Sequence, residues 1–297
     1  MLPTLSLPQF PHQRELFLED KPFFDELFRV LQPRISELTF AGLYLFRDAH
    51  AYRISDMADS LIVTGTGYDG TPYFLPPLGG DRLVAARRLM NAGWEMYGAD
   101  DKFVELLNLS QEITLREDRD NFDYVYRRSD LAELSGNRYH KKKNRVGYFT
   151  KRHEFTLERY ESGHHDGCLA LLEQWRQVHN RWENGSLASE IAATVEALAL
   201  TRELGLEGVV VLVAGKVSAF ALGERLNDTT AVCHFEKGDP FLDGIYQLVN
   251  REFCHQLFTE CEVINREQDL GEPNIRQAKL SYHPIELVKK YRLRKLV

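Results

Sequence analysis

The chain has 297 residues, of which 43% are hydrophobic and 11% aromatic, so it can bury an ordinary core and is not a disordered protein. This length predicts two domains or one large one. The formal net charge of −7 argues against a protein that coats nucleic acid over its whole surface, although a local basic groove stays compatible with it.

The first half of the chain predicts helices and short strands in alternation. The spacing of apolar residues indicates helices over residues 22–31 and 83–97, and a third over 130–144 that ends in a basic cluster. Short apolar segments, several of them broken by glycines, predict strands at residues 52–54, 60–65, 72–75, 103–109 and 122–126.

The second half predicts a more regular order of elements. Helices are expected at residues 168–181, 188–204, 244–258 and 273–282. Strands are expected at residues 208–213, 217–224, 229–235, 261–264 and 285–296. Gly205 is placed to end the second of these helices, and Ala214 and Gly215 to form a hairpin turn.

Targeting and redox signals are weak in this sequence. No apolar run approaches the 18 or more residues of a membrane span, and the N-terminal residues lack the basic and apolar regions of a signal peptide, so we expect a cytoplasmic protein. The four cysteines form neither a C-x-x-C pair nor a cysteine–histidine cluster, and we expect buried free thiols.

A dense polar motif follows the strand predicted over 261–264. Its members are Asn265, Arg266, Asp269, Arg276, Lys279 and Tyr282. A strand that opens into a polar, glycine-containing turn and then a helix is where α/β folds place ligand sites, so we expect these residues to bind substrate, with Tyr282 as a hydrogen-bond donor or proton relay. Arg276 and Lys279 share one helix face and can point together at a phosphate or carboxylate, while Asp269 can orient Arg266 or bind an amine. The alternatives are a solvated helix face and an internal network that locks the turn.

Residues 265–284, together with 232–237 and 37–44, resemble a family of bacterial proteins related to the C-terminal catalytic domain of phosphatidylglycerol lysyltransferases. The resemblance runs from about residue 20 to the end of the chain. It implies an α/β (α+β) fold of two tandem GNAT-like domains, 1–150 and 151–297, whose mixed, mostly antiparallel sheets are flanked by helices. It also implies an aminoacyl- or acyltransferase related to the lysyltransferases and to Fem-type aminoacyl-tRNA transferases, with an unidentified acceptor.

Two side chains near the predicted strand 229–235 are candidate acid–base groups. Strict alternation would place His234 and Glu236 on one face, next to the cleft of an acetyltransferase fold. With Tyr282 they are the expected catalytic residues. The alternative is that His234 is a core histidine and Glu236 the partner of a salt bridge.

The sequence departs from the acetyltransferase pattern where acetyl-CoA would bind. The R/Q-x-x-G-x-G/A loop is absent from residues 237–244 and from residues 76–81, where aspartates and prolines stand instead. Fem-type transferases similarly dispense with CoA, so the departure favours aminoacyl-tRNA over acyl-CoA as the donor. We expect no further cofactor to be required and no metal, because His164, His165 and Asp166 lie in a polar loop.

Basic residues gather in two clusters, at 138–153 and at 289–295. The first contains Lys141, Lys142, Lys143 and Arg145, which suit a phosphate-rich partner such as tRNA or an anionic lipid headgroup. A merely solvated basic helix fits equally well. The rival to an enzyme is a catalytically silent protein of the same fold that binds a nucleotide, peptide or lipid headgroup.

Overall fold

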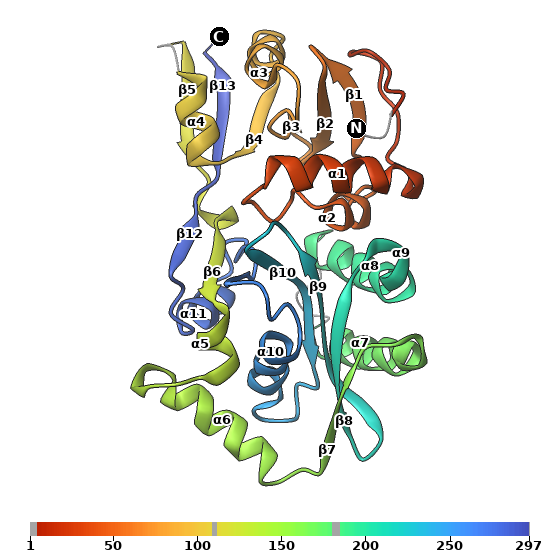
Figure 1. The fold of residues 1–297 in the computed structure, drawn as a ribbon, viewed down its shortest axis with the longest axis vertical. Coiled ribbons are helices and arrows are strands. Elements are labelled where there is room, and N and C mark those ends of the chain that lie inside the picture. The colour runs from red at the N-terminus through yellow and green to blue at the C-terminus, as the bar shows by residue number, and fades with distance from the viewer. Residues whose placement is uncertain (1–4, 109–111, 180–184, 297) are drawn as a thin grey trace. The chain divides into compact units, whose positions relative to one another are not determined.

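The computed structural model of this chain divides into two compact units (Figure 1). The residues that the structure describes are 5–108, 112–179 and 185–296. The first unit comprises Met1–Asp123, Gln268–Pro273 and Leu287–Val297, and the second comprises Tyr124–Glu267 and Asn274–Glu286. The domains expected from the sequence, 1–150 and 151–297, assume that the chain consists of two duplicated halves. These limits remain a prediction.

The first unit contains a six-stranded sheet in the order β1-β2-β3-β4-β13-β5. Its strands are β1 (Arg53–Met57), β2 (Ser60–Thr66), β3 (Pro72–Phe74), β4 (Glu95–Ala99), β5 (Ile113–Glu117) and β13 (Tyr291–Lys295). Its helices are α1 (Lys21–Leu31), α2 (Phe40–Leu45), α3 (Arg82–Asn91) and α4 (Asp101–Leu107). Neighbouring strands are antiparallel except for β3 and β4. The apolar core includes Leu89 of α3, Phe103 of α4 and Leu293 of β13.

Two predictions for the first unit are wrong. The helix predicted over 83–97 ends at Asn91, because Gly93 turns the backbone with a φ of 90° and β4 begins at Glu95. Within the strand predicted over 103–109, residues 103–107 instead belong to the helix α4, and residue 109 lies outside the described residues. The side chain of Asp100 accepts a hydrogen bond from the Phe103 amide, which is the geometry that begins a helix.

The second unit contains a seven-stranded sheet in the order β12-β6-β11-β10-β9-β8-β7. Its strands are β6 (Asp123–Arg127), β7 (Phe155–Arg159), β8 (Glu207–Val213), β9 (Lys216–Arg225), β10 (Thr230–Gly238), β11 (Val263–Asn265) and β12 (Glu286–Val288). Its helices are α5 (Arg128–Glu133), α6 (His140–Thr150), α7 (His165–His179), α8 (Gly185–Ala199), α9 (Thr201–Leu204), α10 (Ile245–Gln256) and α11 (Pro273–Leu280). The helix predicted over 130–144 is therefore two helices, because Leu134 and Gly136 take positive φ values between α5 and α6.

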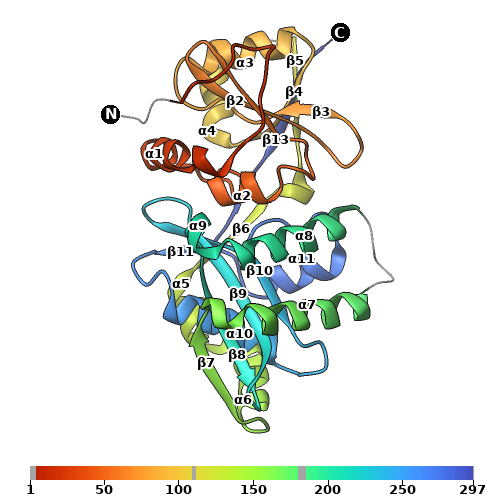
Figure 2. The same cartoon turned by 90° about the vertical axis from the view of Figure 1, so that its right-hand side faces the viewer.

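Helices cover both faces of the second sheet, with α10 on one face and α7 and α8 on the other (Figure 2). Successive side chains of β10 show the two faces. Glu236 accepts a hydrogen bond from Asn250 of α10, whereas Lys237 pairs with Glu190 of α8. Strands β10 and β11 are parallel, and the pairs formed by β7, β8, β9 and β10 are antiparallel. Both units thus have mixed, mostly antiparallel sheets flanked by helices, and the predicted fold class is confirmed.

Candidate active site

An ion pair between Glu236 and Arg266 forms the centre of the candidate site in the second unit. Glu236 lies in β10 and Arg266 directly follows β11, and the parallel pairing of these strands brings the two residues together. Nη2 of Arg266 lies 3.1 Å from each carboxylate oxygen of Glu236. Nδ2 of Asn250 donates a third hydrogen bond, 3.0 Å long, to the same carboxylate. The side chains of Arg266 and Glu236 are only 13% and 15% exposed, so the pair is largely shielded from water.

Two tyrosine rings flank the guanidinium. Cζ of Arg266 lies 4.9 Å from the ring centroid of Tyr282 and 5.8 Å from that of Tyr126. Burial would lower the pKa of Arg266, but Glu236 together with Tyr126, Tyr282 and Cys233 raises that pKa overall, so Arg266 stays charged. Burial likewise raises the pKa of Tyr282, and its phenol keeps its proton at neutral pH.

Two buried polar atoms beside Glu236 lack hydrogen-bond partners among the described residues. They are Nη1 of Arg266, which can donate, and Oδ1 of Asn250, which can accept. A buried polar group without a partner costs about 1–3 kcal/mol. An unused donor and an unused acceptor next to one carboxylate therefore indicate a position for a polar ligand or for bound water.

Two lysines adjoin this centre, each in a different way. Nζ of Lys279 donates a hydrogen bond of 2.6 Å to the backbone oxygen of Arg266. Nζ of Lys142 lies 3.9 Å from the ring centroid of Tyr282 and donates to Oγ of Ser281 at 2.7 Å. Partial burial and then the nearby Arg266 guanidinium lower the pKa of Lys142 to about 8, although Glu236 acts in the opposite direction.

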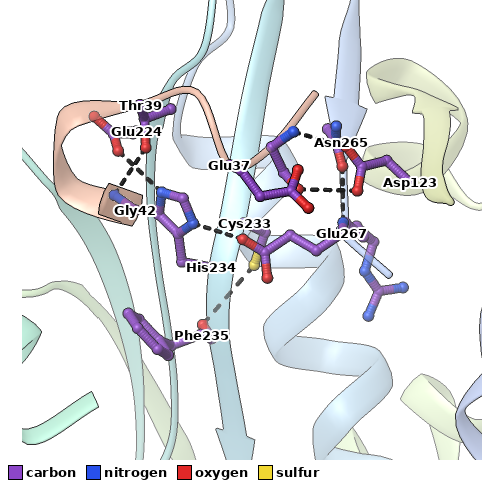
Figure 3. A network of polar contacts seen from close by, with 12 residues as sticks. Glu37, Thr39, Gly42, Asp123, Glu224, Cys233, His234, Phe235, Asn265 and Glu267 are labelled. Atoms are coloured by element: carbon purple, nitrogen blue, oxygen red, sulfur yellow. Dashed lines mark hydrogen bonds and ion pairs between the residues drawn. The ribbon is translucent and has the colours of Figure 1, made fainter. Parts of the chain in front are cut away.

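His234 does not share a face with Glu236, because a β-bulge between Cys233 and Phe235 breaks the alternation of β10. Its imidazole lies between two carboxylates, with Nε2 3.0 Å from Glu224 and Nδ1 2.7 Å from Glu267 (Figure 3). The His234 side chain is 3% exposed. Burial would lower the pKa of His234, but the hydrogen bonds to Glu224 and Glu267 raise it to about 10. His234 is therefore a buried imidazolium whose two nitrogens are both occupied.

Three other residues of the polar motif lie at the end of β11, on the turn that follows it, and on α11. Oδ1 of Asn265 accepts from the Glu267 amide at 2.7 Å, and Oδ1 of Asp269 accepts from the Gly271 amide at 2.9 Å. Within the first unit, the buried Asp269 also pairs with Arg119 at 3.2 Å. Asn265 and Asp269 thus stabilise the turn, as in the internal network that the sequence left as an alternative. Arg276 lies half-buried on α11.

The first basic cluster is divided by the geometry of α6. Lys141, Lys143 and Arg145 are exposed, and Arg145 forms an ion pair of 3.2 Å with Asp243, whereas Lys142 is turned towards Tyr282. Most residues of the second basic cluster form ion pairs inside the first unit. Lys290 is fully buried between Glu37 and Asp123, and Arg292 pairs with Glu95 and Asp118.

The segment that would hold a pyrophosphate in an acetyltransferase uses its amides internally. The Asp239 amide donates to the Ser218 carbonyl, and the Phe241 amide donates to Oδ1 of Asp239. A side chain at Gly244 would lie 2.2 Å from the Arg145 carbonyl, so α6 closely approaches this segment. These contacts leave less of the backbone available to bind a phosphate group.

The described residues contain neither a cluster suited to a metal ion nor a helix suited to crossing a membrane. Over residues 5–108, 112–179 and 185–296, no cluster of three or more His, Cys, Asp or Glu side chains is arranged to hold a metal ion. His164 contacts Glu158 at 3.0 Å. In the same ranges, none of the helices combines the length and the apolar character that crossing a membrane requires. All four cysteines are buried free thiols.

Comparisons with known proteins place the chain in a family. The family described as "Phosphatidylglycerol lysyltransferase, C-terminal" matches residues 28–294. A conserved protein of unknown function from Bacteroides thetaiotaomicron has a similar structure, with a TM-score of 0.88 and 28% identity over 98% of this chain and 100% of that one. No curated protein matches the sequence.

Two more distant structures show the fold alone. The C-terminal domain of a putative lysylphosphatidylglycerol synthetase from Agrobacterium fabrum aligns with a TM-score of 0.62 and 14% identity, over 93% of this chain and 92% of that one. FemX aligns with a TM-score of 0.58 and 6% identity, over 95% of this chain and 96% of that one. The expected likeness to the lysyltransferase domain and to Fem-type folds is confirmed.

Proposed function

The chain belongs to the family of phosphatidylglycerol lysyltransferase C-terminal domains, and on this premise we propose that it transfers an aminoacyl or acyl group to an acceptor. The main support within the site is the Glu236 carboxylate, which Arg266 and Asn250 hold in place. Next to it lie an unused hydrogen-bond donor, Nη1 of Arg266, and an unused acceptor, Oδ1 of Asn250. Acyl transfer requires a base, a donor to the carbonyl oxygen and a means of orienting the reactants, and this arrangement offers all three.

In the proposed reaction, an amine or hydroxyl of the acceptor attacks the carbonyl carbon of the donor ester. Glu236 takes the proton from the attacking group, and Nη1 of Arg266 donates to the carbonyl oxygen as negative charge develops on it. The new bond to carbon forms, the ester bond breaks, and the leaving oxygen takes the proton from Glu236. Tyr282 positions Arg266 through its ring face, and Lys279 fixes the backbone at Arg266.

His234 has a positioning part in this scheme. With both nitrogens engaged by carboxylates and a pKa of about 10, it is poorly suited to exchange protons with a substrate near pH 7. Its ion pairs join β9, β10 and the segment after β11, which is the framework that carries Glu236 and Arg266. We assign Asn265 to the same framework, and Arg276 to the binding of substrate.

The proposed donor is an aminoacyl-tRNA rather than acyl-CoA, because the segment 239–244 uses its own amides. Such a donor requires a cytoplasmic location. The family description names lysine as the transferred group and phosphatidylglycerol as the acceptor, so these are the first pair to test. The exposed Lys141 and Lys143 of α6 are suited to contact the phosphates of tRNA or of an anionic lipid surface.

The test is the transfer of labelled amino acids from a charged tRNA pool to vesicles that contain phosphatidylglycerol, and in parallel to soluble amines and peptides. We expect Glu236→Gln to lower the transfer rate by about 10²–10⁴-fold, as for the loss of a general base. Glu262→Gln, which changes an exposed carboxylate just before β11, is the matched control and should leave the rate unchanged. Unfolding midpoints of both variants show whether Glu236→Gln remains folded.

A negative result is also informative. If the wild-type protein binds charged tRNA or lipid but transfers no label to any acceptor, the chain is the catalytically silent binding protein of the same fold. If Glu236→Gln is as active as Glu262→Gln, Glu236 is not the base.

A further inference from the structure

Lys142 differs from its neighbours on α6 in a way that the basic cluster does not explain. Lys141 and Lys143 are exposed, whereas Lys142 is half-buried, with Nζ over the ring of Tyr282. The ring of Tyr282 therefore receives two cations, because Cζ of Arg266 lies 4.9 Å from its centroid and Nζ of Lys142 lies 3.9 Å from it. Two cations on one ring repel each other, and this arrangement is costly without a nearby anion.

The negative charge that the second unit supplies at this point is insufficient for both cations. Glu236 binds Arg266 through Nη2, and Nη1 of the same guanidinium has no hydrogen-bond acceptor among the described residues. Lys142 donates to the neutral hydroxyl of Ser281, and within the described ranges no carboxylate forms an ion pair with it. One carboxylate thus accompanies two cationic groups.

From this geometry we propose that Lys142 and Arg266 form a binding site for a phosphate group in the second unit. Nη1 of Arg266 carries two N–H groups. One of them donates a hydrogen bond to the phosphate and the other remains for the carbonyl oxygen of the proposed transfer, while Lys142 supplies a second, adjustable contact from α6. A tetrahedral phosphate fits better than a carboxylate. Its oxygens point in several directions, whereas Arg266 can offer only one of its two terminal nitrogens because Nη2 is already bound to Glu236.

The site has a thermodynamic signature that a surface patch lacks. The groups facing Lys142 are Arg266, Glu236 and Tyr282, and the pKa of Lys142 is lowered to about 8 by burial and by Arg266. A bound dianion raises that pKa again, so binding near pH 9 should draw a proton onto Lys142. Anion binding to a lysine with the ordinary model-peptide pKa of about 10.4 takes up no proton at that pH.

The experiment is isothermal titration calorimetry of the whole chain at pH 9 with inorganic phosphate, glycerol 3-phosphate, sulfate and acetate, in two buffers of different ionisation enthalpy. Sulfate keeps its charge throughout this range, so any proton taken up with sulfate belongs to the protein. We expect uptake of a substantial fraction of one proton per bound anion. We also expect Lys142→Gln to weaken anion affinity at least tenfold and to abolish the uptake.

Lys141→Gln and Lys143→Gln are matched controls, since each removes the same charge from the same helix, and we expect them to change the affinity less than twofold. Equal weakening in all three variants would overturn the site and leave only a general surface potential. Acetate binding as tight as phosphate would overturn the assignment to phosphate. A difference in affinity between glycerol 3-phosphate and inorganic phosphate would show whether the site prefers a phosphate ester or the free ion.

This site does not require the chain to be an enzyme. No acyl donor or acceptor is present in the titration, so a failure of the transfer reaction leaves the result intact. Conversely, absence of anion binding at Lys142 would leave the proposed transfer at Glu236 untouched.

Discussion

The buried imidazolium of His234 predicts an unusual dependence of stability on pH. Its pKa rises from 6.5 to about 10 on folding, because Glu224 and Glu267 bind the charged ring. A group whose pKa is raised by folding stabilises the protein fully below its unfolded pKa, and that contribution is lost as the pH rises through the folded value. Here the contribution is roughly 5 kcal/mol as an upper limit, present below pH 6.5 and gone near pH 10.

The assay is urea unfolding of the wild-type protein and of His234→Gln across pH 6 to 10. We expect the variant to lose about 3–5 kcal/mol at pH 6.5, because two partly buried carboxylates lose their cation, and to approach the wild type as the pH rises. Lys142, whose pKa is lowered by folding, acts in the opposite direction above pH 8 but cancels in the difference between the two proteins. His164→Gln, which removes a contact with the half-exposed Glu158, serves as the control and should cost no more than about 1 kcal/mol. A wild-type minus variant difference that stays constant from pH 6.5 to 9.5 would refute the reasoning.

Three further outcomes follow from the structure. Acetyl-CoA should bind with a Kd above roughly 100 μM, measured by calorimetry, because neither loop has the pyrophosphate pattern; low-micromolar binding would instead favour an acyl-CoA donor. Arg276→Ala should weaken binding of the transferred substrate by about 1.5–3 kcal/mol in a binding titration, with little change in the thermal midpoint; a loss of about 3–5 kcal/mol of folding stability would make Arg276 part of the scaffold. Gly223→Ala should destabilise the chain by about 1–3 kcal/mol or more in urea unfolding, because its Cβ would lie 2.1 Å from the Val232 carbonyl oxygen, whereas Gly163→Ala, which meets nothing within 4 Å, should be nearly neutral.

Much of the second unit follows from local patterns in the sequence. The hairpin at Ala214 and Gly215 has the two positive φ values that its turn requires, and Gly205 ends α9 with a φ of 73°. The sequence indicates Glu236 as a catalytic candidate and Arg266 as a substrate-binding one, but not that they pair. Their contact depends on the parallel pairing of β10 with β11, which no local pattern determines.

The features that were missed arise from tertiary packing. The bulge that places His234 and Glu236 on different faces cannot be predicted from the sequence. It is a shift of one residue in the pairing of two apolar strands, and no residue type signals it. Asn250 could have been found from the sequence, because it is a polar residue between the apolar Val249 and Phe253 on the buried face of α10. The partial burial of Lys142 could also have been predicted, since Lys142 precedes the buried Val146 of α6 by four residues and so lies on the same face of that helix.

The place of β13 in the first sheet has a consequence for the order in which the chain acquires its structure. β13 lies between β4 and β5, and the ion pair of Glu95 with Arg292 joins residues 197 positions apart. During synthesis from the N-terminus, β4 and β5 emerge long before the strand that joins them, so both keep unpaired edges while residues 124–286 are made. The segments of the second unit are all complete by then. The later unit in the sequence is therefore the one able to fold first, and the earlier one waits for the strand that completes its sheet.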